Sequence, residues 1–317
     1  MLYLTEQEVT QLVTIRDALE VVEAALRGQG EGTAVNLPRQ RVRMPPGTLH
    51  LMAGSLAGPQ RFGFKAYTTF GGYIKFHVFL YNRQEGNLLA IIEGDRLGQL
   101  RTGAASGIAT RYLSLPMASV LAVIGTGWQA RTQLSGICAV RDIQQVRVYS
   151  RDSERREKFA AEMSERHQVK VRAVSSAEEA AEAAEILVTI TTAGEPVLFG
   201  DWIMPGAHVN AAGANSLFRR EIDAKLIIQS DFVCVDSVEQ AQIESGELMV
   251  PIEKGALDWS SIHQLSEVLC GISVGRKTTR DRTLFKSHGI ALEDIALASL
   301  VYERAIQEGV GKSVTEN

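Results

Sequence analysis

The 317-residue chain has little cysteine and no long apolar run, and both shortages exclude classes of protein. Its 3 cysteines, Cys138, Cys234 and Cys270, are widely spaced and odd in number, which predicts neither a disulfide framework nor a zinc site. No stretch reaches the roughly 18 uninterrupted apolar residues of a membrane span. The first residues lack the basic and apolar regions of a signal peptide. We therefore expect buried, reduced thiols, no bound metal, no membrane contact and a cytoplasmic location.

Positive charge is not in excess either. The chain has 33 Lys and Arg against 37 Asp and Glu, a formal net charge of -4. This balance lacks the basic character of a nucleic-acid-binding domain, so no nucleic-acid partner is expected. The remaining composition, 45% hydrophobic and 22% charged, is ordinary for a globular protein. The length suits about two domains.

The N-terminal third mixes helical and extended patterns. The first ~25 residues have a helical apolar period and end in glycines, which predicts a helix. From Leu37 to about Ile92, short β-rich runs are punctuated by Gly and Pro, which predicts a sheet. Leu97–Leu113 then has helical composition, and its small residues around Gly103 suggest close packing against another backbone.

From Val120 onward, strand and helix patterns alternate, which is the signature of a parallel α/β sheet. The last residues return to an amphipathic helix over Leu292–Gln307, and we expect this helix to pack on the first domain. The sequence therefore predicts an α/β fold. Residues 114–289 form a Rossmann-type doubly wound parallel sheet, and residues 1–113 with 290–317 form a second, α+β domain.

The most informative segment runs from Gly125 to Ala130, between an apolar strand and a helix. In a Rossmann fold such a turn binds the pyrophosphate of a dinucleotide: Gly125 permits the tight turn and Gly127 lets the backbone approach the phosphates. Ala130 replaces the usual third glycine, and the helix N-terminus offers free N–H groups to the anion. The predicted cofactor residues here are Gly125, Thr126, Gly127, Trp128, Gln129 and Ala130.

The end of the second strand indicates which dinucleotide binds. Ser150 takes the position of the usual ribose-binding acid, and Arg151 follows at once. A guanidinium suits a 2′-phosphate, so we expect NADP(H) to be preferred, with NAD(H) possible. Two alternatives stay open: Asp152 turns toward a 2′-hydroxyl, or Arg151 is a solvated loop residue.

Several motifs outside this turn resemble the ornithine cyclodeaminase/mu-crystallin family. They occur in family order at Pro38–Arg39, Gly63–Lys65, Leu100–Ser106, Ile124–Gly127, Gly213–Ser216 with Arg220–Asp223, and Phe285–Asp294. The resemblance covers nearly the whole chain. It implies that the α+β domain binds substrate and mediates dimerisation, that the protein is a homodimer, and that its partner is a small amino, imino or keto acid.

Three cations lie in segments that are otherwise apolar or small: Arg39, Lys65 and Arg101. Buried cations need anionic partners, and one substrate carboxylate shared among them would serve. The resemblance implies the same role, with His50 nearby in the substrate site. The alternative is that each cation pairs with an acid of its own domain, such as Glu93 or Asp95.

Lys65 has a second predicted role, because neighbouring cations lower the pKa of an ammonium group and favour proton donation to an imine nitrogen. The resemblance also implies further cofactor contacts. These are Thr102, Thr191, Thr192, Gly213, Asp236, Ser287 and Gly289. For Thr191-Thr192 a simple turn after the strand is the alternative. His288 has no second ligand at metal spacing.

The chain departs from the ornithine-cyclising members of the family at two acidic positions. His50 stands where they carry Glu, and Asn215 where they carry Asp. An amide cannot act as a base at neutral pH, so cyclodeamination is in doubt. Asn215 can still hydrogen-bond a substrate, and a left-handed turn residue is its alternative.

The resulting hypothesis is an NAD(P)-dependent reductase or dehydrogenase. It transfers a hydride to the α-carbon of a cyclic ketimine or α-imino or keto acid to give an L-amino acid, with Lys65, Arg101 and Asn215 as catalytic residues. Two other functions stay open. One is an ornithine cyclodeaminase that forms proline and ammonia with catalytic NAD; the other is an NADPH-binding protein of the mu-crystallin type without turnover.

Overall fold

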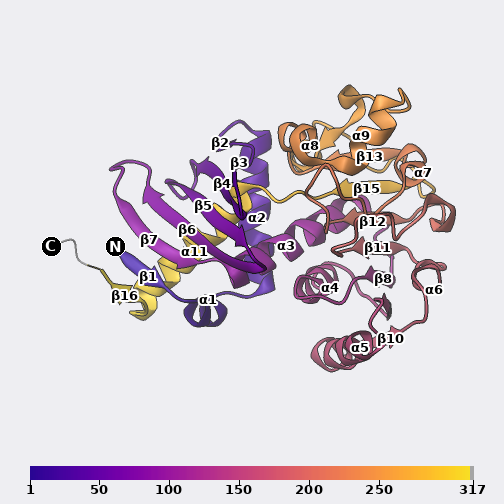
Figure 1. The fold of residues 1–317 in the computed structure, drawn as a ribbon, viewed down its shortest axis with the longest axis horizontal. Coiled ribbons are helices and arrows are strands. Elements are labelled where there is room, and N and C mark those ends of the chain that lie inside the picture. The colour runs from indigo at the N-terminus through magenta and orange to yellow at the C-terminus, as the bar shows by residue number, and fades with distance from the viewer. Residues whose placement is uncertain (315–317) are drawn as a thin grey trace. The chain divides into compact units, whose positions relative to one another are not determined.

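The computed structural model describes residues 1–314, and of Tyr73 only the backbone. Over this range the chain divides into two compact units (Figure 1). Unit 1 is Met1–Arg101 together with the chain from Gly289 onward, and unit 2 is Thr102–His288. The units are joined inside helix α3 (Asp95–Leu113) and again at His288-Gly289, whereas the sequence analysis placed the first boundary after residue 113.

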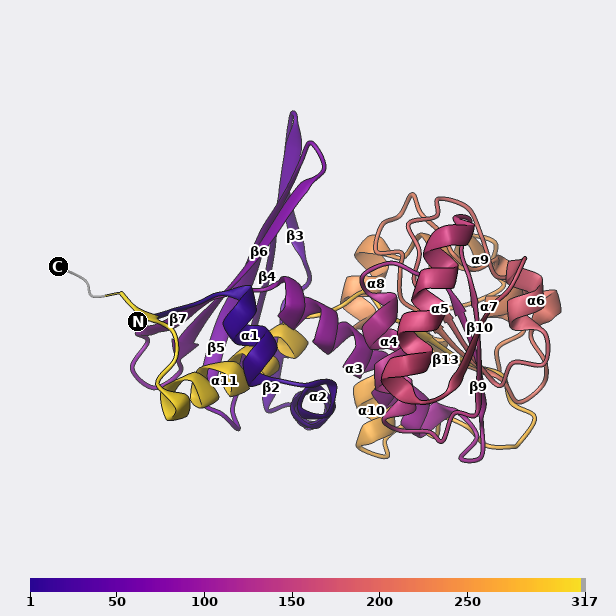
Figure 2. The same cartoon turned by 90° about the horizontal axis from the view of Figure 1, so that it is seen from below.

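Unit 1 is built on a mostly antiparallel sheet in the order β16-β1-β7-β6-β5-β4-β2, with β3 paired to β4. Its strands are β1 (Leu2–Leu4), β2 (Ala34–Asn36), β3 (Gln40–Met44), β4 (Gly47–Leu56), β5 (Arg61–Phe70), β6 (Tyr73–Asn82), β7 (Leu88–Glu93) and β16 (Lys312–Ser313). Figure 2 shows the long strands β4 and β6 extending past the helices of this unit. The sheet predicted between Leu37 and Ile92 is confirmed.

Helix α11 (Ala291–Glu308) packs on one face of this sheet and on helix α2 (Ile15–Gly30), as the sequence analysis expected for the C-terminal helix. Gly63 of the sheet allows helix α11 to pack this closely, because a Cβ at this position would lie 2.9 Å from Ile295 Cδ1. The same face of the sheet buries Met52, Val78 and Ile92. The opposite side chains of these strands remain half-buried.

The prediction of one helix over the first ~25 residues was wrong, because two local signals divide this segment. Strand β1 comes first, pairing in parallel with β7, and helix α1 (Glu6–Leu12) ends before α2 begins. Thr5 and Thr14 each cap the following helix in a capping box, and Val13 between the helices is extended. Capping boxes outweigh a continuous apolar period here.

Unit 2 is the predicted Rossmann-type domain. Its strands pair in parallel in the order β10-β9-β8-β11-β12-β15-β13-β14. They are β8 (Val120–Ile124), β9 (Gln145–Tyr149), β10 (Lys170–Ala173), β11 (Ile186–Thr189), β12 (His208–Ala211), β13 (Phe232–Val235), β14 (His263–Gln264) and β15 (Thr283–Lys286). The chain proceeds outward from β8 to β10 and then returns to β11 on the other side. The point where strand order reverses is therefore beside β8, and there doubly wound sheets bind ligands.

Helices flank this parallel sheet. They are α4 (Ala130–Cys138), α5 (Ser153–His167), α6 (Ala177–Ala181), α7 (Ala224–Ile228), α8 (Val238–Glu244), α9 (Gly246–Glu253) and α10 (Leu265–Leu269), with short turns η1 (Gly200–Trp202) and η2 (Trp259–Ser261). The close packing expected around Gly103 is confirmed, because a Cβ there would lie 2.2 Å from the Thr132 carbonyl oxygen. Gly136 on α4 approaches the Gly103 carbonyl equally closely.

Two absences hold for the part of the chain that the structure describes. None of its helices has the length and apolar character needed to cross a membrane. Within the same residues, no His, Cys, Asp and Glu side chains gather in a group able to hold a metal ion. The cysteines are free thiols; Cys234 is buried, whereas Cys138 and Cys270 are half-buried, and burial raises the pKa of Cys138 to about 12.

Candidate functional site

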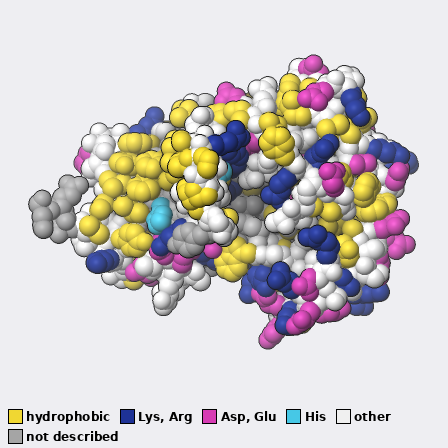
Figure 3. Space-filling model, in the orientation of Figure 1, with side chains coloured by type: hydrophobic (Ala, Val, Ile, Leu, Met, Phe, Trp, Pro, Cys, Tyr) yellow, Lys and Arg dark blue, Asp and Glu magenta, His cyan; other side chains and the backbone are white. Residues whose placement is uncertain are grey.

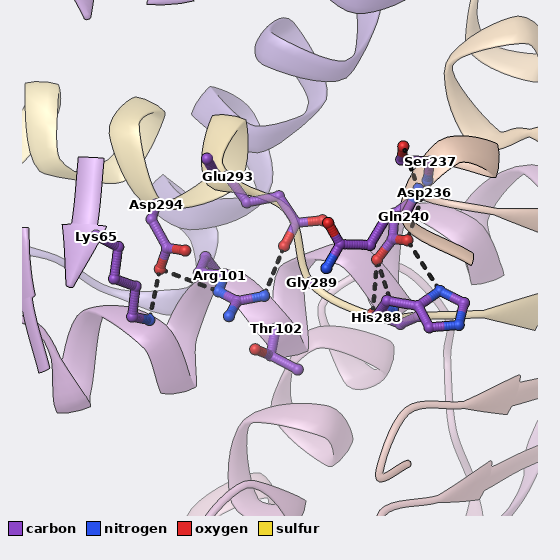
Figure 4. Close-up of polar contacts among 12 residues, drawn as sticks. Lys65, Arg101, Thr102, Asp236, Ser237, Gln240, His288, Gly289, Glu293 and Asp294 are labelled. Atoms are coloured by element: carbon purple, nitrogen blue, oxygen red, sulfur yellow. Dashed lines mark hydrogen bonds and ion pairs between the residues drawn. The ribbon is translucent and has the colours of Figure 1, made fainter. Parts of the chain in front are cut away.

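Unit 1 gathers two of the predicted cations around two acids of helix α11. Lys65 on β5 donates to Asp294 Oδ1 at 2.9 Å, and Arg101 on α3 contacts the same oxygen through Nε at 3.2 Å. Arg101 Nη1 also donates to Glu293 Oε2 at 2.9 Å (Figure 4). Lys65 is 3% exposed, and Glu293 and Asp294 are fully buried. The ion pairs are therefore largely dry, where charge interactions are strong.

Two glycines let these cations approach the backbone. An ideal Cβ on Gly98 would lie 2.9 Å from Lys65 Nζ, and one on Gly289 would lie 2.3 Å from Arg101 Nη1. Gly289 also has φ +74°, a left-handed conformation that side chains disfavour. Gly289, predicted as a cofactor contact, thus has a structural role beside Arg101.

Lys65 and Asp294, which form one of these ion pairs, differ in how their surroundings shift their pKa values. Burial lowers the pKa of Lys65, and the positive charges of Arg101 and Arg39 lower it further, although Asp294 opposes them. Burial raises the pKa of Asp294, but Arg101 and Lys65 more than offset this, so its pKa lies below the usual value. The cluster therefore holds an ionised carboxylate beside an ammonium that releases its proton more readily than usual.

Arg39 belongs to the same unit and is 4% exposed. Its Nη2 donates to the Gly289 carbonyl at 3.2 Å, whereas Arg41 and Arg43, on the following strand, are not buried. Burial thus distinguishes Arg39 from its neighbours, which the sequence could not do. Arg39, Lys65 and Arg101 together carry three positive charges.

The alternative of internal ion pairs is partly correct, but with different acids. Lys65 and Arg101 pair with Glu293 and Asp294, while Glu93 pairs with Lys75. Arg39 lies near these ion pairs, since its positive charge lowers the pKa of Lys65. Three buried cations gathered in this way suit a ligand that carries a carboxylate.

His50 lies on the same face of the sheet as Lys65, as the strand register shows. Met52 pairs with Lys65, and His50, two residues earlier, pairs with Tyr67. The imidazole stacks on the Tyr67 ring with centroids 4.3 Å apart, and its Nε2 lies 3.3 Å from Thr69 Oγ1. These two contacts fix the orientation of the imidazole on this face of the sheet.

The predicted cofactor residues of unit 2 lie at one edge of its sheet, because the carboxyl ends of parallel strands face the same way. Gly125 follows β8, has φ +109° and donates its N–H to the Tyr149 carbonyl at 2.8 Å. A Cβ there would lie 2.4 Å from the Ile190 carbonyl, while one at Gly127 would meet nothing within 4 Å. The turn therefore requires glycine at Gly125 and leaves open space at Gly127, which fits a phosphate group. The side chain of Gln129 does not cap helix α4, and the N–H groups of Ala130 and Thr132 donate at 3.2 Å to the carbonyls of Gly127 and Gln129.

The side chains after β9 differ in whether they are already bound within the protein or can bind a ligand. Thr126 Oγ1 donates to Ser150 Oγ at 2.8 Å, tying the glycine turn to the end of this strand. Asp152 is the N-cap of α5 and accepts the Arg155 N–H at 3.0 Å. Arg151 is exposed. The acid is therefore engaged in capping, and the guanidinium is the group at this strand end that can move toward a ligand.

The remaining cofactor candidates are partly engaged with the protein itself. Thr191 Oγ1 accepts the Ala193 N–H at 3.1 Å, as in the turn that was the alternative for this residue, and Thr192 is exposed. Thr102 is 8% exposed, and its carbonyl accepts from Gln133 at 3.2 Å. Gly213 and Asn215 follow β12 and are half-buried.

Asp236 holds the ends of β13 and β15 together. Its carboxylate accepts the His288 N–H at 2.7 Å and the Ser237 N–H at 3.0 Å (Figure 4). It also accepts the Ser287 hydroxyl at 3.3 Å. Asp236 is fully buried, so these contacts make it an organiser of the strand ends. Ser287 is 3% exposed and is one of its donors.

Sequence reasoning quoted Glu293 and Asp294 within a family motif but assigned them no role. The available signal was the pattern Ala291-Leu292-Glu293-Asp294-Ile295, two acids inside an apolar helix start. Acids are almost never buried unless paired, so such acids predict buried cations elsewhere. Pairing the two observations would have identified this cluster.

These features define a class: a protein with a dinucleotide-type parallel α/β unit and a second unit that holds a buried cationic cluster. Residues 1–309 match the ornithine cyclodeaminase/mu-crystallin family, so the chain belongs to that family. The Δ1-pyrroline-2-carboxylate reductase of Bacillus cereus is 33% identical over 324 residues, covering 99% of each protein.

Solved structures of similar proteins show the same fold. The Δ1-pyrroline-2-carboxylate reductase of Thermococcus litoralis, in complex with NADH and L-proline, has 35% identity and a TM-score of 0.95, covering 99% of this chain and 100% of that one. An archaeal alanine dehydrogenase dimer with bound NAD has 32% identity and a TM-score of 0.93, covering 99% of each chain. The predicted α/β fold class and family are therefore confirmed.

Proposed function

We propose that this protein is an NAD(P)-dependent reductase that converts a cyclic ketimine or related α-imino acid into an L-amino acid. The observation that carries the proposal is the group of three buried cations in unit 1, Arg39, Lys65 and Arg101. Such a group suits a substrate that carries a carboxylate. Similar proteins are named Δ1-pyrroline-2-carboxylate reductase and alanine dehydrogenase, and both names denote reactions of such acids.

In this proposal, unit 1 binds the substrate and unit 2 binds the dinucleotide. Arg101 and Arg39 hold the substrate carboxylate, with His50 in the same substrate site, and Lys65 donates a proton to the imine nitrogen. The nicotinamide, when bound, supplies the hydride that reduces the α-carbon. Asn215 hydrogen-bonds the substrate nitrogen or the carboxamide, since an amide both donates and accepts. The pyrophosphate takes the turn Gly125–Ala130. The nicotinamide half takes Thr102 of helix α3 and the strand ends that carry Thr191, Gly213 and Ser287.

The test is an assay of the purified protein with Δ1-pyrroline-2-carboxylate and NADPH or NADH. Loss of the reduced-nicotinamide absorbance together with stoichiometric L-proline supports the proposal. Ammonia release from L-ornithine with only catalytic NAD identifies a cyclodeaminase instead. Cofactor binding without either reaction, across a panel of imino and keto acids, identifies a non-catalytic binding protein. Asn215 and His50 stand where a cyclodeaminase needs carboxylates, which favours the first outcome.

We further propose that the protein prefers NADP(H), because Arg151 is exposed at the end of β9 while Asp152 is engaged as an N-cap. Arg151→Ala is then expected to raise the KM for NADPH about 10-fold and leave the KM for NADH within about twofold, since a charge-assisted pair with the 2′-phosphate is lost. Steady-state kinetics with both cofactors measure this. Arg155→Ala, which removes an exposed guanidinium paired with Asp152, is the control. A wild-type protein that favours NADH contradicts the preference.

We propose a homodimer formed through the face of the unit 1 sheet that faces away from α11. Apolar side chains gather over this sheet in Figure 3, and Phe64 stacks on Phe79 with centroids 4.6 Å apart. Both rings are only half-buried. A second copy of the chain would cover this apolar face, and a similar protein was solved as a dimer.

Phe64→Lys is accordingly expected to shift the protein from dimer to monomer, because a lysine directly facing the partner would be desolvated without a counter-charge. Light scattering after gel filtration gives the mass. Met117→Lys, at an apolar side chain 87% exposed in unit 2, is the control and keeps the dimer. Monomeric wild-type protein at micromolar concentration would refute the proposal.

We also propose a cytoplasmic location. The structure shows Cys138, Cys234 and Cys270 as free thiols, which suits a reducing compartment. Cell fractionation with an antibody against the native protein tests this; recovery from an extracellular or membrane fraction contradicts it.

A further inference from the structure

The parallel sheet of unit 2 holds a buried charged cluster that no step of the proposed reaction uses. It consists of Glu221, Glu247 and Lys286, each 1% exposed or less. The cluster lies beside the segments that follow β11 and β12, residues 190–193 and 212–215. The second segment carries Asn215.

Glu221 binds both segments through their N–H groups. Its Oε1 accepts the Thr191 N–H at 2.5 Å, and its Oε2 accepts the N–H groups of Gly213 at 2.6 Å and Ala214 at 3.1 Å. The Thr189 hydroxyl also donates to Oε2 at 3.2 Å. The two backbones lie close together here, because a Cβ on Gly213 would be 2.5 Å from Thr191 N. The Glu221 carboxylate thus joins the segments after β11 and β12 at the point where Gly213 lets their backbones approach.

Lys286 binds the second segment through its carbonyl groups, whereas Glu221 binds it through its N–H groups. Its ammonium donates to the Ala214 carbonyl at 2.5 Å and the Ala211 carbonyl at 3.2 Å, and forms an ion pair with Glu247 at 3.0 Å. Glu247 in turn accepts the Glu221 N–H at 2.7 Å. The peptide groups that precede Asn215 are therefore held by a carboxylate at their N–H groups and by an ammonium at their carbonyls.

Ionisation of Glu221 is subject to opposing effects. Burial raises the pKa of its carboxyl and the charge of Glu247 raises it further, whereas Lys286 and the hydrogen bond from Thr191 lower it; the net result is a raised pKa. Both carboxyl oxygens accept backbone N–H groups, so these hydrogen bonds do not require a proton on Glu221.

We infer that Glu221 and Lys286 are positioning residues that fix the segment carrying Asn215 against the segment after β11. This inference deepens the proposed function, on which it rests, because Asn215 acts only where its backbone places it. The contacts of both side chains are with backbone groups, with the Thr189 hydroxyl and with Glu247. Their effect is on the orientation of Asn215, and a displacement of about 1 Å at such a group costs up to two orders of magnitude in rate.

Glu221→Gln tests this. A glutamine of nearly the same shape has one acceptor and one donor, so in either orientation its NH2 faces a backbone N–H. We expect kcat for Δ1-pyrroline-2-carboxylate to fall about 20-fold, with NADPH affinity within about threefold, a split that global destabilisation does not produce. Thr189→Val removes one contact to Glu221 and is the milder variant, with about a threefold loss of kcat. If Glu221→Gln does not fold, the result rests on Thr189→Val.

The matched control is Glu185→Gln. Glu185 also accepts two backbone N–H groups, those of Ser119 at 2.7 Å and Val120 at 3.0 Å, but at the amino end of β8. We expect it to lower the melting temperature without changing kcat. Hydrogen exchange of the cofactor-free protein provides a second readout: peptides spanning residues 189–216 exchange faster in Glu221→Gln and Thr189→Val than in Glu185→Gln.

The outcomes separate the hypotheses. Faster exchange in residues 189–216 together with the kcat loss supports the inference. Unchanged kcat in Glu221→Gln and Thr189→Val, or exchange no faster than in Glu185→Gln, overturns it. If the wild type reduces no imine, the proposed function fails on that assay alone. The exchange data then still decide whether Glu221 orders the segment.

Discussion

Replacing Lys65 with methionine is expected to lower kcat for imine reduction about 10³-fold, because the group that protonates the imine nitrogen is lost. Methionine has a similar length, and Asp294 keeps its contact with Arg101 at 3.2 Å, so the variant retains an ion pair at the buried carboxylate. The KM should also rise, since one of three positive charges near the substrate carboxylate disappears. Stopped-flow or steady-state consumption of NADPH measures both parameters.

The pH dependence distinguishes proton donation from simple charge attraction. Burial and the neighbouring Arg101 and Arg39 lower the pKa of Lys65 below 10.5. A donor must be protonated, so kcat is full at low pH and falls as pH rises through this lowered pKa. The alkaline limb should be absent in Lys65→Met.

Lys75→Met is the matched control for Lys65→Met. Lys75 lies on the adjacent strand β6 and pairs with Glu93 at 3.0 Å, but its side chain is 46% exposed. Its loss should leave kcat within about twofold, as for most exposed ion pairs. If Lys65→Met binds NADPH normally and still turns over at the wild-type rate, Lys65 is not the proton donor.

The outcome for the three cations shows how far sequence reasoning extends. Unusual surroundings identified Arg39, Lys65 and Arg101 as buried, and the structure buries all three. The prediction was a shared substrate carboxylate, with nearby acids such as Glu93 as the alternative partners. Lys65 and Arg101 instead pair with Asp294 and Glu293, about 190 residues or more along the chain. Local pattern reveals that a charge is buried, but long-range pairing depends on how α11 packs on the sheet.

The parallel sheet was predictable because its strands show local signals in the sequence. Strands such as Val120–Ile124 are short apolar runs followed by glycine or helix signals, and each carries its own evidence. Strand β15 (Thr283–Lys286) carries no such evidence, because Thr-Leu-Phe-Lys has neither alternation nor an apolar run. The order of its neighbours, β12 and β13, is likewise set by packing. The cluster of Glu221, Glu247 and Lys286 depends on that order and was not predictable.

Gly289→Ala is expected to lower kcat/KM about 10²-fold through Arg101, although the substituted residue carries no charge. The new methyl group would lie 2.3 Å from Arg101 Nη1, which holds Glu293 at 2.9 Å. The guanidinium must therefore leave its position, and a misplaced carboxylate-binding group costs about this much. The loss should appear mainly in KM, because carboxylate binding precedes the chemical step. Substrate titration at saturating NADPH measures it.

Strain is the competing explanation for Gly289→Ala, because φ is +74° at this position. Gly32 in the same unit also has φ +74°, but a Cβ there would meet nothing within 4 Å. Gly32→Ala thus carries the same backbone cost, roughly 1 kcal/mol, without the collision. We expect both variants to lose thermal stability through this strain, Gly289→Ala more because Arg101 is displaced, and only Gly289→Ala to lose substrate affinity. Equal affinities would mean that the position of the Arg101 guanidinium does not control substrate binding, and the carboxylate site would then have to be sought elsewhere in unit 1.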